Sequence, residues 1–324
     1  MGMVIDGKWI DDDEKFRNPT GGAFVRAESV WRDALTADGS SGFKAEPGRY
    51  HLFLAPSCPW AHRTQIIRHL KGLEDVISVT LSDLPRITSW AYTQGIDELQ
   101  PGANGKLELH DVYIAADPNY TGRVTVPTLW DRQKKTIVNN ESAEIIRMLN
   151  TEFDEWATND LPDLYPEAHR AEIDMLNERI YETVNNGVYR CGFAKTQEAY
   201  EEYIYPMFET LDFLEDRLSK RRYLAADHPT EADWRLFVTM IRFDFVYFSH
   251  FKCNIRRIQD YPNLWNYTLE LYQTPGVADL VDIPGIKKGY YGGQANVNPT
   301  GIVPVGPDID LTVPHNRGQV AKAV

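Results

Sequence analysis

A cysteine between a predicted strand and a predicted helix constrains this chain more than any other feature. Residues 50–55 form a short apolar run typical of a buried strand, and residues 59–71 have the character of a helix. Pro59 suits the first helical position, because the N–H groups of a first turn have no intrahelical partner. Cys58 would then face the positive end of the helix dipole, which favours the reactive thiolate over the thiol. The alternative is a small buried core residue, which this context favours less.

No second cysteine lies near Cys58 in the sequence. The position three residues later is Ala61, so there is no C-x-x-C dithiol, and Cys191 and Cys253 are distant. Three scattered cysteines do not describe a disulfide framework and suit a reducing cytosol, so we expect a cytoplasmic protein. A mixed disulfide on Cys58 would need a thiol from elsewhere, most simply a small-molecule thiol.

The charge balance limits the partners of the chain. Its 324 residues include 34 Lys and Arg against 47 Asp and Glu, which gives a net charge of −13. We therefore expect neither nucleic acid nor an anionic membrane surface as a partner. No apolar run approaches the roughly 20 residues of a membrane span, and the start of the sequence lacks a signal-peptide pattern. Without zinc-ligand spacing or a Gly-rich phosphate loop, we expect no metal and no nucleotide.

The segments that follow predict an α/β domain. Residues 76–81 form a β-branched strand, so the first strand, helix and second strand make a βαβ unit. Residues 125–131 and 135–139 are spaced as an antiparallel hairpin, with Val-Pro as a candidate cis bond. Residues 139–149 predict a helix whose polar N-terminus can hold a carboxylate. Residues 83–122 are too long for a bare loop and suggest a functional insertion. This order is that of a thioredoxin-like domain.

The remainder predicts an all-α domain. Helical spacing appears at about 167–186, 196–218, 231–248 and 261–273, and Thr230 with Asp233 fits a capping box. The chain then turns to Gly, Pro and Asn. We predict an N-terminal arm over 1–47, a thioredoxin-like domain over 48–152, a helical domain over 165–288 and an extended tail over 289–324.

Six short sequence motifs indicate a particular protein family for the combination of these two domains. Together they resemble the glutathionyl-hydroquinone reductases, the Xi class of glutathione transferases, over about residues 20 to 310. The strings are CPWAHR at 58–63, GRVTVPTLWD at 122–131, ESAEIIRM at 141–148, NGVYRCGFA at 186–194, RFDFVYFSHFKCN at 242–254 and NPTGIVP at 298–304.

The resemblance implies a reaction with glutathione as co-substrate. A hydroquinone that carries a glutathionyl thioether is reduced to the free hydroquinone through a mixed disulfide on Cys58, and glutathione disulfide leaves. A monothiol that waits for an external thiol fits this chemistry. The resemblance also implies a homodimer.

The resemblance implies that five residues bind glutathione. Val126 would offer its backbone N–H and carbonyl to the cysteinyl part, and Arg123 would pair with a carboxylate. Glu141 would take the γ-glutamyl ammonium and Ser142 its carboxylate, although Ser142 can equally cap the helix. Trp90 would pack beside the glycyl or cysteinyl part. Without the resemblance, Arg123 fits a surface ion pair and Trp90 a covering aromatic.

Three tyrosines are implied in hydroquinone binding: Tyr189, Tyr247 and Tyr290. Such phenols bind the hydroquinone hydroxyls, and Tyr189 and Tyr290 would be catalytic by donating a proton to the ring or steadying a keto tautomer. Packing is the alternative, because the chain has 17 tyrosines. We expect structural roles for His62 and Arg63.

Two rival functions stay open at this point. One is an omega-like transferase that acts on dehydroascorbate or on protein mixed disulfides. The other is a non-catalytic interaction module with a transferase fold, in which Cys58 would be an ordinary thiol.

Overall fold

In a computed structural model of the protein, which describes residues 2–11 and 22–320, the chain divides into two compact units. The N-terminal unit comprises residues 2–11 and 26–161, and the C-terminal unit comprises residues 22–25 and 162–320. The four domain limits drawn from the sequence stay predictions, and part of the predicted arm lies outside the described residues.

A mixed four-stranded sheet forms the centre of the N-terminal unit. Its strands are β3 (Tyr50–Leu54), β4 (Ser78–Leu81), β7 (Thr128–Asp131) and β8 (Thr136–Asn139). The order is β4-β3-β7-β8, with β3 parallel to β4 and antiparallel to β7. All five residues of β3 are buried, as a strand covered on both faces requires. This topology confirms the predicted thioredoxin-like arrangement.

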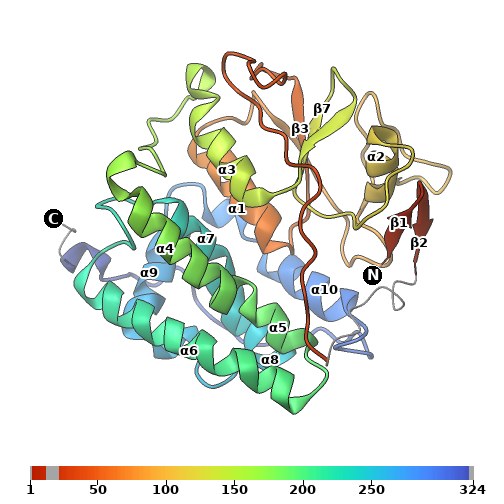
Figure 1. Ribbon diagram of the computed structural model, residues 1–324. Coiled ribbons are helices and arrows are strands. Elements are labelled where there is room, and N and C mark those ends of the chain that lie inside the picture. The colour runs from red at the N-terminus through yellow and green to blue at the C-terminus, as the bar shows by residue number, and fades with distance from the viewer. Residues whose placement is uncertain (1, 12–21, 321–324) are drawn as a thin grey trace. The chain divides into compact units, whose positions relative to one another are not determined.

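Helices lie on both sides of this sheet (Figure 1). On one side, α1 (Pro59–Leu70) packs against α3 (Ser142–Thr151); α2 (Leu109–Ala116) lies on the other. The predicted insertion 83–122 contains α2 and a two-stranded ribbon of β5 (Ala91–Tyr92) and β6 (Leu107–Glu108). A short 3₁₀ helix, η2 (Asp154–Trp156), follows α3.

The N-terminal segment adds a hairpin and an edge cover to this unit. The hairpin pairs β1 (Met3–Ile5) with β2 (Lys8–Ile10). Further on, Arg32 forms an antiparallel bridge with Asn139 at the end of β8, and the N–H of Asp33 donates to the carbonyl of Val138 at 3.1 Å. Residues 31–33, called here the edge segment, therefore run along the outer side of β8.

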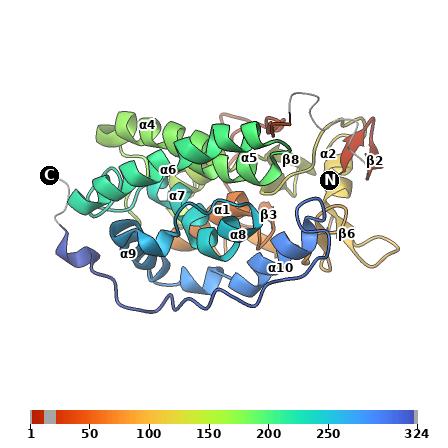
Figure 2. The same ribbon diagram turned by 90° about the horizontal axis from the view of Figure 1, so that it is seen from below.

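Helices make up the C-terminal unit. They are η3 (Glu167–His169), α4 (Arg170–Ile180), η4 (Tyr181–Asn185), α5 (Gly187–Phe193), α6 (Gln197–Lys220), α7 (Glu231–Arg242), η5 (Phe243–Tyr247), α8 (Phe248–His250), η6 (Ile258–Asp260), α9 (Pro262–Tyr272), η7 (Ala278–Leu280), α10 (Ile283–Gly293) and η8 (Arg317–Gln319). Figure 2 shows α4, α5 and α6 on one side of α7 and α10 on the other. Every residue of α7 except Arg235 is buried, so this helix forms the core.

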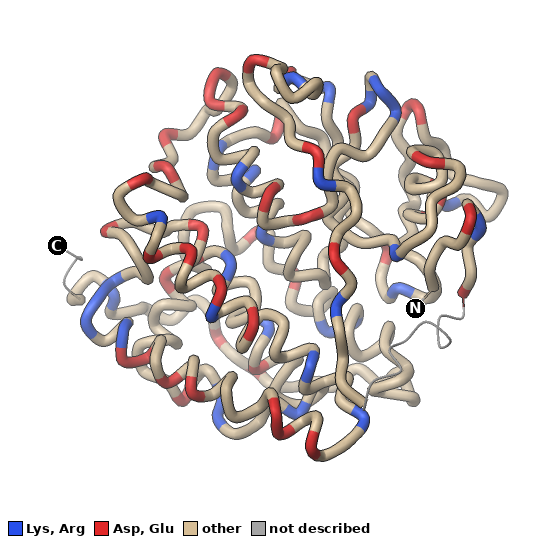
Figure 3. The backbone as a smooth tube through the Cα atoms, in the orientation of Figure 1, with Lys and Arg blue, Asp and Glu red and all other residues tan. Residues whose placement is uncertain are grey.

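The N-terminus of α7 confirms the predicted capping box. The N–H of Thr230 donates to the Asp233 carboxylate at 2.7 Å, and Asp233 also accepts from the hydroxyl of Tyr267 at 2.8 Å. These bonds fix the start of the central helix. The outer helix α6 carries seven acidic residues and two basic ones, so it contributes to the net negative charge of the chain (Figure 3).

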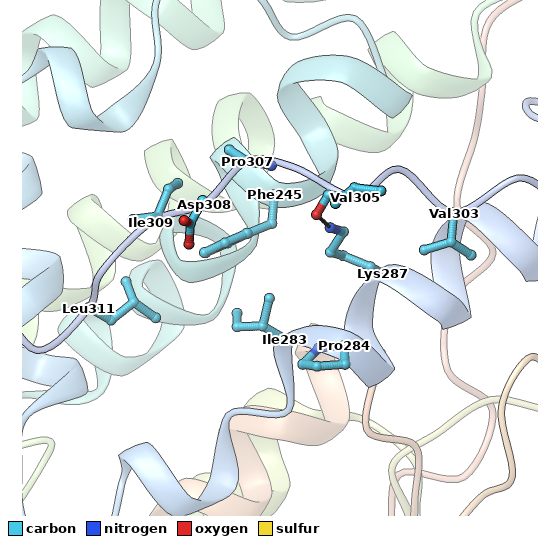
Figure 4. Close-up of a pocket in the computed structure, with 10 residues that line it drawn as sticks. All are labelled: Phe245, Ile283, Pro284, Lys287, Val303, Val305, Pro307, Asp308, Ile309 and Leu311. Carbon is cyan, nitrogen blue, oxygen red and sulfur yellow. Dashed lines mark hydrogen bonds between the residues drawn. The ribbon is translucent and has the colours of Figure 1, made fainter.

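The last part of the chain runs back along the C-terminal unit as an extended segment, residues 294–316 (Figure 2). The ammonium of Lys287 on α10 donates to the carbonyls of Val305 and Gly306, and Figure 4 shows the first of these contacts. The buried guanidinium of Arg317 then donates to three carbonyls at the C-terminal end of α6, those of Leu218, Arg221 and Arg222. Lys287 thus holds the middle of the segment, and Arg317 fixes the residue that follows its C-terminal end.

A cavity of about 440 Å³ lies between α10 and this extended segment (Figure 4). Apolar side chains such as Phe245, Ile283 and Leu311 line it, together with Lys287 and Asp308. It contains none of the residues predicted to bind substrate.

Candidate active site

Cys58 occupies the position predicted from the sequence. It is the N-cap residue of α1, with φ −80° and ψ 120°, and Pro59 takes the first helical position. Its sulfur lies 3.6 Å from the carbonyl oxygen of Val126, to which the thiol donates. The Val126–Pro127 bond is cis, as predicted. The structure therefore brings the proposed nucleophile and the backbone proposed to bind the cysteinyl part of glutathione into contact.

The predicted γ-glutamyl site lies at the N-terminus of α3. Glu141 is the N-cap residue, and its carboxylate accepts from the N–H of Ala143 at 3.0 Å and from the hydroxyl of Ser29 at 3.1 Å. The capping role that the sequence offered to Ser142 therefore belongs to Glu141. Ser142 instead accepts two hydrogen bonds from Arg63, at 3.0 Å from Nε and 2.6 Å from Nη2.

The two remaining predicted glutathione residues lie in the connections of the N-terminal unit. Trp90 is half-buried, and the guanidinium of Arg86 lies over its ring at 4.8 Å from the centroid. Arg123 is half-buried, and its carbonyl accepts from the hydroxyl of Tyr120 at 2.7 Å. A role for either residue in binding stays a prediction.

The three predicted tyrosines meet inside the C-terminal unit. Tyr189 comes from α5, Tyr247 from the end of η5 and Tyr290 from α10. The hydroxyl of Tyr290 lies 2.6 Å from that of Tyr189 and 2.9 Å from that of Tyr247. The ring of Phe251 packs against all three. Residues about 100 positions apart in the sequence thus form one hydroxyl cluster, with Tyr290 in the middle.

Burial favours the neutral form of two of these phenols, Tyr247 and Tyr290. It raises the pKa of Tyr247 and of Tyr290 well above the usual value, and the neighbouring Tyr189 raises both further. The charge of the buried Arg242, the last residue of α7, acts in the opposite direction on both. Tyr247 and Tyr290 therefore stay neutral hydrogen-bond donors at neutral pH.

The other two cysteines are buried, with exposed fractions of 2% for Cys191 and 0% for Cys253. Burial raises the pKa of the Cys253 thiol, and its hydrogen bond with Cys191 raises it further. Neither thiol has the environment of a nucleophile.

Arg63 and Ser29 are the site residues that sequence reasoning missed. Arg63 belongs to the CPWAHR string, where it was assigned a structural role, and it is 1% exposed. Ser29 lies in the N-terminal arm, more than 100 residues before its partner Glu141. The positive charge of Arg63, together with the polar residues at 139–144, could have suggested that Arg63 has a partner inside the protein. No local sequence signal marks Ser29.

Comparison with known proteins identifies the family to which this architecture belongs. Family models for the glutathione S-transferase N-terminal domain and C-terminal domain match residues 57–152 and 197–269. The glutathionyl-hydroquinone reductase PcpF of Sphingobium chlorophenolicum is 53% identical, over 95% of this chain and 96% of its own.

Two solved structures agree with this family assignment. A Xi-class glutathione transferase from Natrialba magadii is 44% identical with a TM-score of 0.91, and covers 99% of this chain and 98% of its own. The glutathione-bound structure of YqjG, a glutathione transferase homolog from Escherichia coli K-12, is 44% identical with a TM-score of 0.87, over 98% of this chain and 99% of its own.

Both units thus have the architecture of glutathione transferases. The chain belongs to the glutathionyl-hydroquinone reductases, the Xi class of these transferases.

The described residues contain neither a membrane-spanning helix nor a group of metal ligands. None of the helices found there combines the length and the apolar character needed to span a membrane. In the same part of the chain, His, Cys, Asp and Glu side chains form no group of three that could hold a metal ion.

Proposed function

We propose that this protein is a glutathione-dependent oxidoreductase that reduces glutathionyl-hydroquinones to hydroquinones. One observation carries the proposal: a single cysteine caps the N-terminus of α1, beside the Val126 carbonyl, with Ala61 where a dithiol would have its second sulfur. Such a thiol can form a mixed disulfide but needs a second glutathione to resolve it.

The first step transfers the glutathionyl group to the protein. The Cys58 thiolate attacks the sulfur of the thioether, so that a sulfur–sulfur bond forms and the bond from sulfur to the ring carbon breaks. The electron pair of the broken bond stays on the ring carbon, which is reduced and takes up a proton. The hydroxyl cluster of Tyr189 and Tyr290 supplies that proton or binds the keto tautomer that precedes it.

The second step regenerates the thiolate. The thiolate of a second glutathione attacks the glutathionyl sulfur of the mixed disulfide, and glutathione disulfide leaves. The proton that this glutathione loses balances the one taken up by the ring. The net reaction consumes one conjugate and one glutathione and yields one hydroquinone and one glutathione disulfide.

The binding roles follow the chemistry of the residues. The Glu141 carboxylate takes the ammonium of the γ-glutamyl part, and Ser142 takes its carboxylate at the positive end of α3. Val126 pairs with the cysteinyl part through its backbone, while Arg123 and Trp90 bind the remainder of glutathione. The hydroquinone hydroxyls are bound by the phenols of Tyr189, Tyr247 and Tyr290. Because the chain has a net charge of −13, an anionic substrate needs hydrogen-bond donors within the site itself.

We further propose a cytoplasmic homodimer. The location is supported by three cysteines of which none forms a disulfide, as expected in a reducing compartment. The dimer is supported by the family to which the chain belongs. Light scattering coupled to size exclusion measures the mass in solution; a mass near 37.1 kDa, that of one chain, would contradict the dimer.

A substrate panel tests the function. Glutathionyl-hydroquinone, dehydroascorbate and a small mixed disulfide are compared at equal enzyme, with glutathione disulfide formation as the readout. We expect the conjugate to have the highest kcat/KM. Higher values for the other two would indicate an omega-like transferase. No turnover of any substrate, with a Cys58 that alkylates only at the pH of an ordinary thiol, would indicate an interaction module.

A further inference from the structure

The guanidinium of Arg63 and the hydroxyl of Ser142 form a buried pair at the junction of α1 and α3. Arg63 is 1% exposed and Ser142 is 3% exposed. Two nitrogens of the same guanidinium, Nε and Nη2, donate to the single oxygen of Ser142 at 3.0 and 2.6 Å. The Glu141 carboxylate lies 3.6 Å from Nη2, and the ring of Trp60 lies beneath the guanidinium at 5.1 Å from its centroid.

The chemistry of this pair fixes the direction of the hydroxyl proton. A guanidinium has donors but no acceptor, whereas a serine hydroxyl has one proton and two acceptor lone pairs. The two bonds from Arg63 therefore occupy the acceptor side of Ser142. Its own proton must be donated away from Arg63, toward a different acceptor.

We propose that Arg63 is a positioning residue for the γ-glutamyl end of glutathione, because it commits Ser142 to donate to the ligand's α-carboxylate. The inference rests on the proposed function and assigns a residue of the same site. Without Arg63, the Ser142 hydroxyl could rotate toward other acceptors, and an incoming carboxylate would have to reorient it at a cost to binding.

The carboxylate of the neighbouring Glu141 adds to the selectivity of this site for the γ-glutamyl end of the ligand. The Glu141 carboxylate is held by the N–H of Ala143, by the hydroxyl of Ser29 and by its ion pair with Arg63, which fixes a carboxylate next to the committed donor. An α-amino acid end presents an ammonium and a carboxylate on one carbon, which matches this adjacent pair of charges. A ligand with the ammonium alone would satisfy only Glu141.

The test measures binding without turnover. The probes are S-methylglutathione, an inert thioether, and its analogue with 4-aminobutanoyl in place of γ-glutamyl, which keeps the ammonium and lacks the α-carboxylate. Isothermal titration on the full chain gives the affinity ratio of the two. We expect Arg63→Met and Ser142→Ala each to lower this ratio about tenfold. The double variant should lose no more than either single variant, because both act through one hydrogen bond to the ligand.

Arg68→Met is the matched control. Arg68 lies on the same helix, but its donors go to the carbonyls of Ile77 and Glu74, so its loss should leave the ratio unchanged. Circular dichroism checks that each variant is folded. Should Arg63→Met fail to fold, Arg63→Lys, which keeps the charge but cannot donate from two planar nitrogens, should lower the ratio in the same direction.

Two results would overturn the proposal. One is an unchanged ratio in a folded Arg63 variant; the other is additive losses in the double variant. Failure of the proposed function is distinct, because it would appear as a wild-type protein that binds neither probe or does not reduce the conjugate.

Discussion

The sulfur of Cys58 lies 3.6 Å from the carbonyl oxygen of Val126, so the thiol donates to the backbone proposed to bind the ligand. Ionisation removes that donor and leaves the carbonyl for the cysteinyl N–H of glutathione. Loss of the thiol proton therefore frees an acceptor position on this carbonyl that the ligand can use.

The first prediction concerns this sulfur. Cys58→Ala should lower kcat for a glutathionyl-hydroquinone by at least about a thousandfold, because covalent transfer needs the nucleophile. Steady-state formation of hydroquinone, followed by chromatography, measures it. Cys191→Ala is the control and should retain activity. Near-normal turnover by Cys58→Ala would exclude the mixed-disulfide mechanism.

The second prediction concerns which thiol carries glutathione. Treatment with the conjugate alone should give one glutathione adduct, on Cys58, because Cys191 and Cys253 are buried and burial raises the pKa of Cys253. Intact-protein mass spectrometry with peptide mapping identifies the adduct. Modification of Cys191 or Cys253 at a comparable rate would contradict the assignment of the nucleophile.

The third prediction concerns the middle hydroxyl of the tyrosine cluster. Tyr290→Phe removes the partner of both Tyr189 and Tyr247, and should lower kcat about a hundredfold. Binding of S-methylglutathione should not change, because this probe has no ring. Tyr223→Phe is the control, because Tyr223 donates to Glu270 outside the cluster. An equal loss of kcat in both variants would mean that the loss comes from reduced protein stability and not from the removal of a proton donor.

The fourth prediction concerns acid stability. Burial, with the charges of Arg132 and Arg68, lowers the pKa of His51 to about 3 from the usual 6.5. The folded state therefore keeps His51 neutral while the unfolded state takes up a proton below pH 6.5. Stability from this group is complete above pH 6.5 and falls toward pH 3, by about 1.4 kcal/mol per pH unit.

A variant isolates the contribution of His51 from that of the carboxylates. His51→Gln keeps a polar partner for Ser78, which lies 2.7 Å from the ring nitrogen, but does not titrate. Urea unfolding at pH 7, 6 and 5 should show a smaller loss of unfolding free energy in the variant. Parallel losses in both proteins would contradict the buried neutral histidine.

Much of the N-terminal unit could be predicted because local signals agree there. The apolar run at 50–55, the Cys-Pro step and the β-branched residues at 76–81 each indicate one element, and the structure has β3, α1 and β4 there. Two helices of the C-terminal unit, α5 and α10, were not predicted as separate helices. α5 contains two glycines and α10 contains four, and glycine disfavours a helix by propensity.

Tertiary contacts explain why these helices form. In α10, the Asp282 carboxylate caps the N–H of Gly285 at 2.9 Å, and Ile286 and Tyr290 are buried. In α5, a Cβ at Gly192 would lie 2.1 Å from the ring of Phe251, so only glycine allows this close packing. Neither reason can be seen in a local stretch of sequence.

The site divides in the same way. Cys58 and the polar start of α3 follow from local pattern, but the tyrosine cluster was reached only through the family resemblance. The pairing of Arg63 with Ser142 joins residues 79 positions apart. Such a hydrogen bond depends on how α1 and α3 pack, which composition and spacing do not reveal.

The edge segment along β8 has a consequence for the protein in a concentrated solution. An uncovered edge strand offers its N–H and C=O groups to another chain and can start aggregation. Here the backbone of residues 31–33 already pairs with the carbonyl of Val138 and the N–H of Asn140. A variant that lacks residues 1–33 would therefore expose the unpaired edge of β8. We expect such a variant to aggregate before it shows any loss of catalysis.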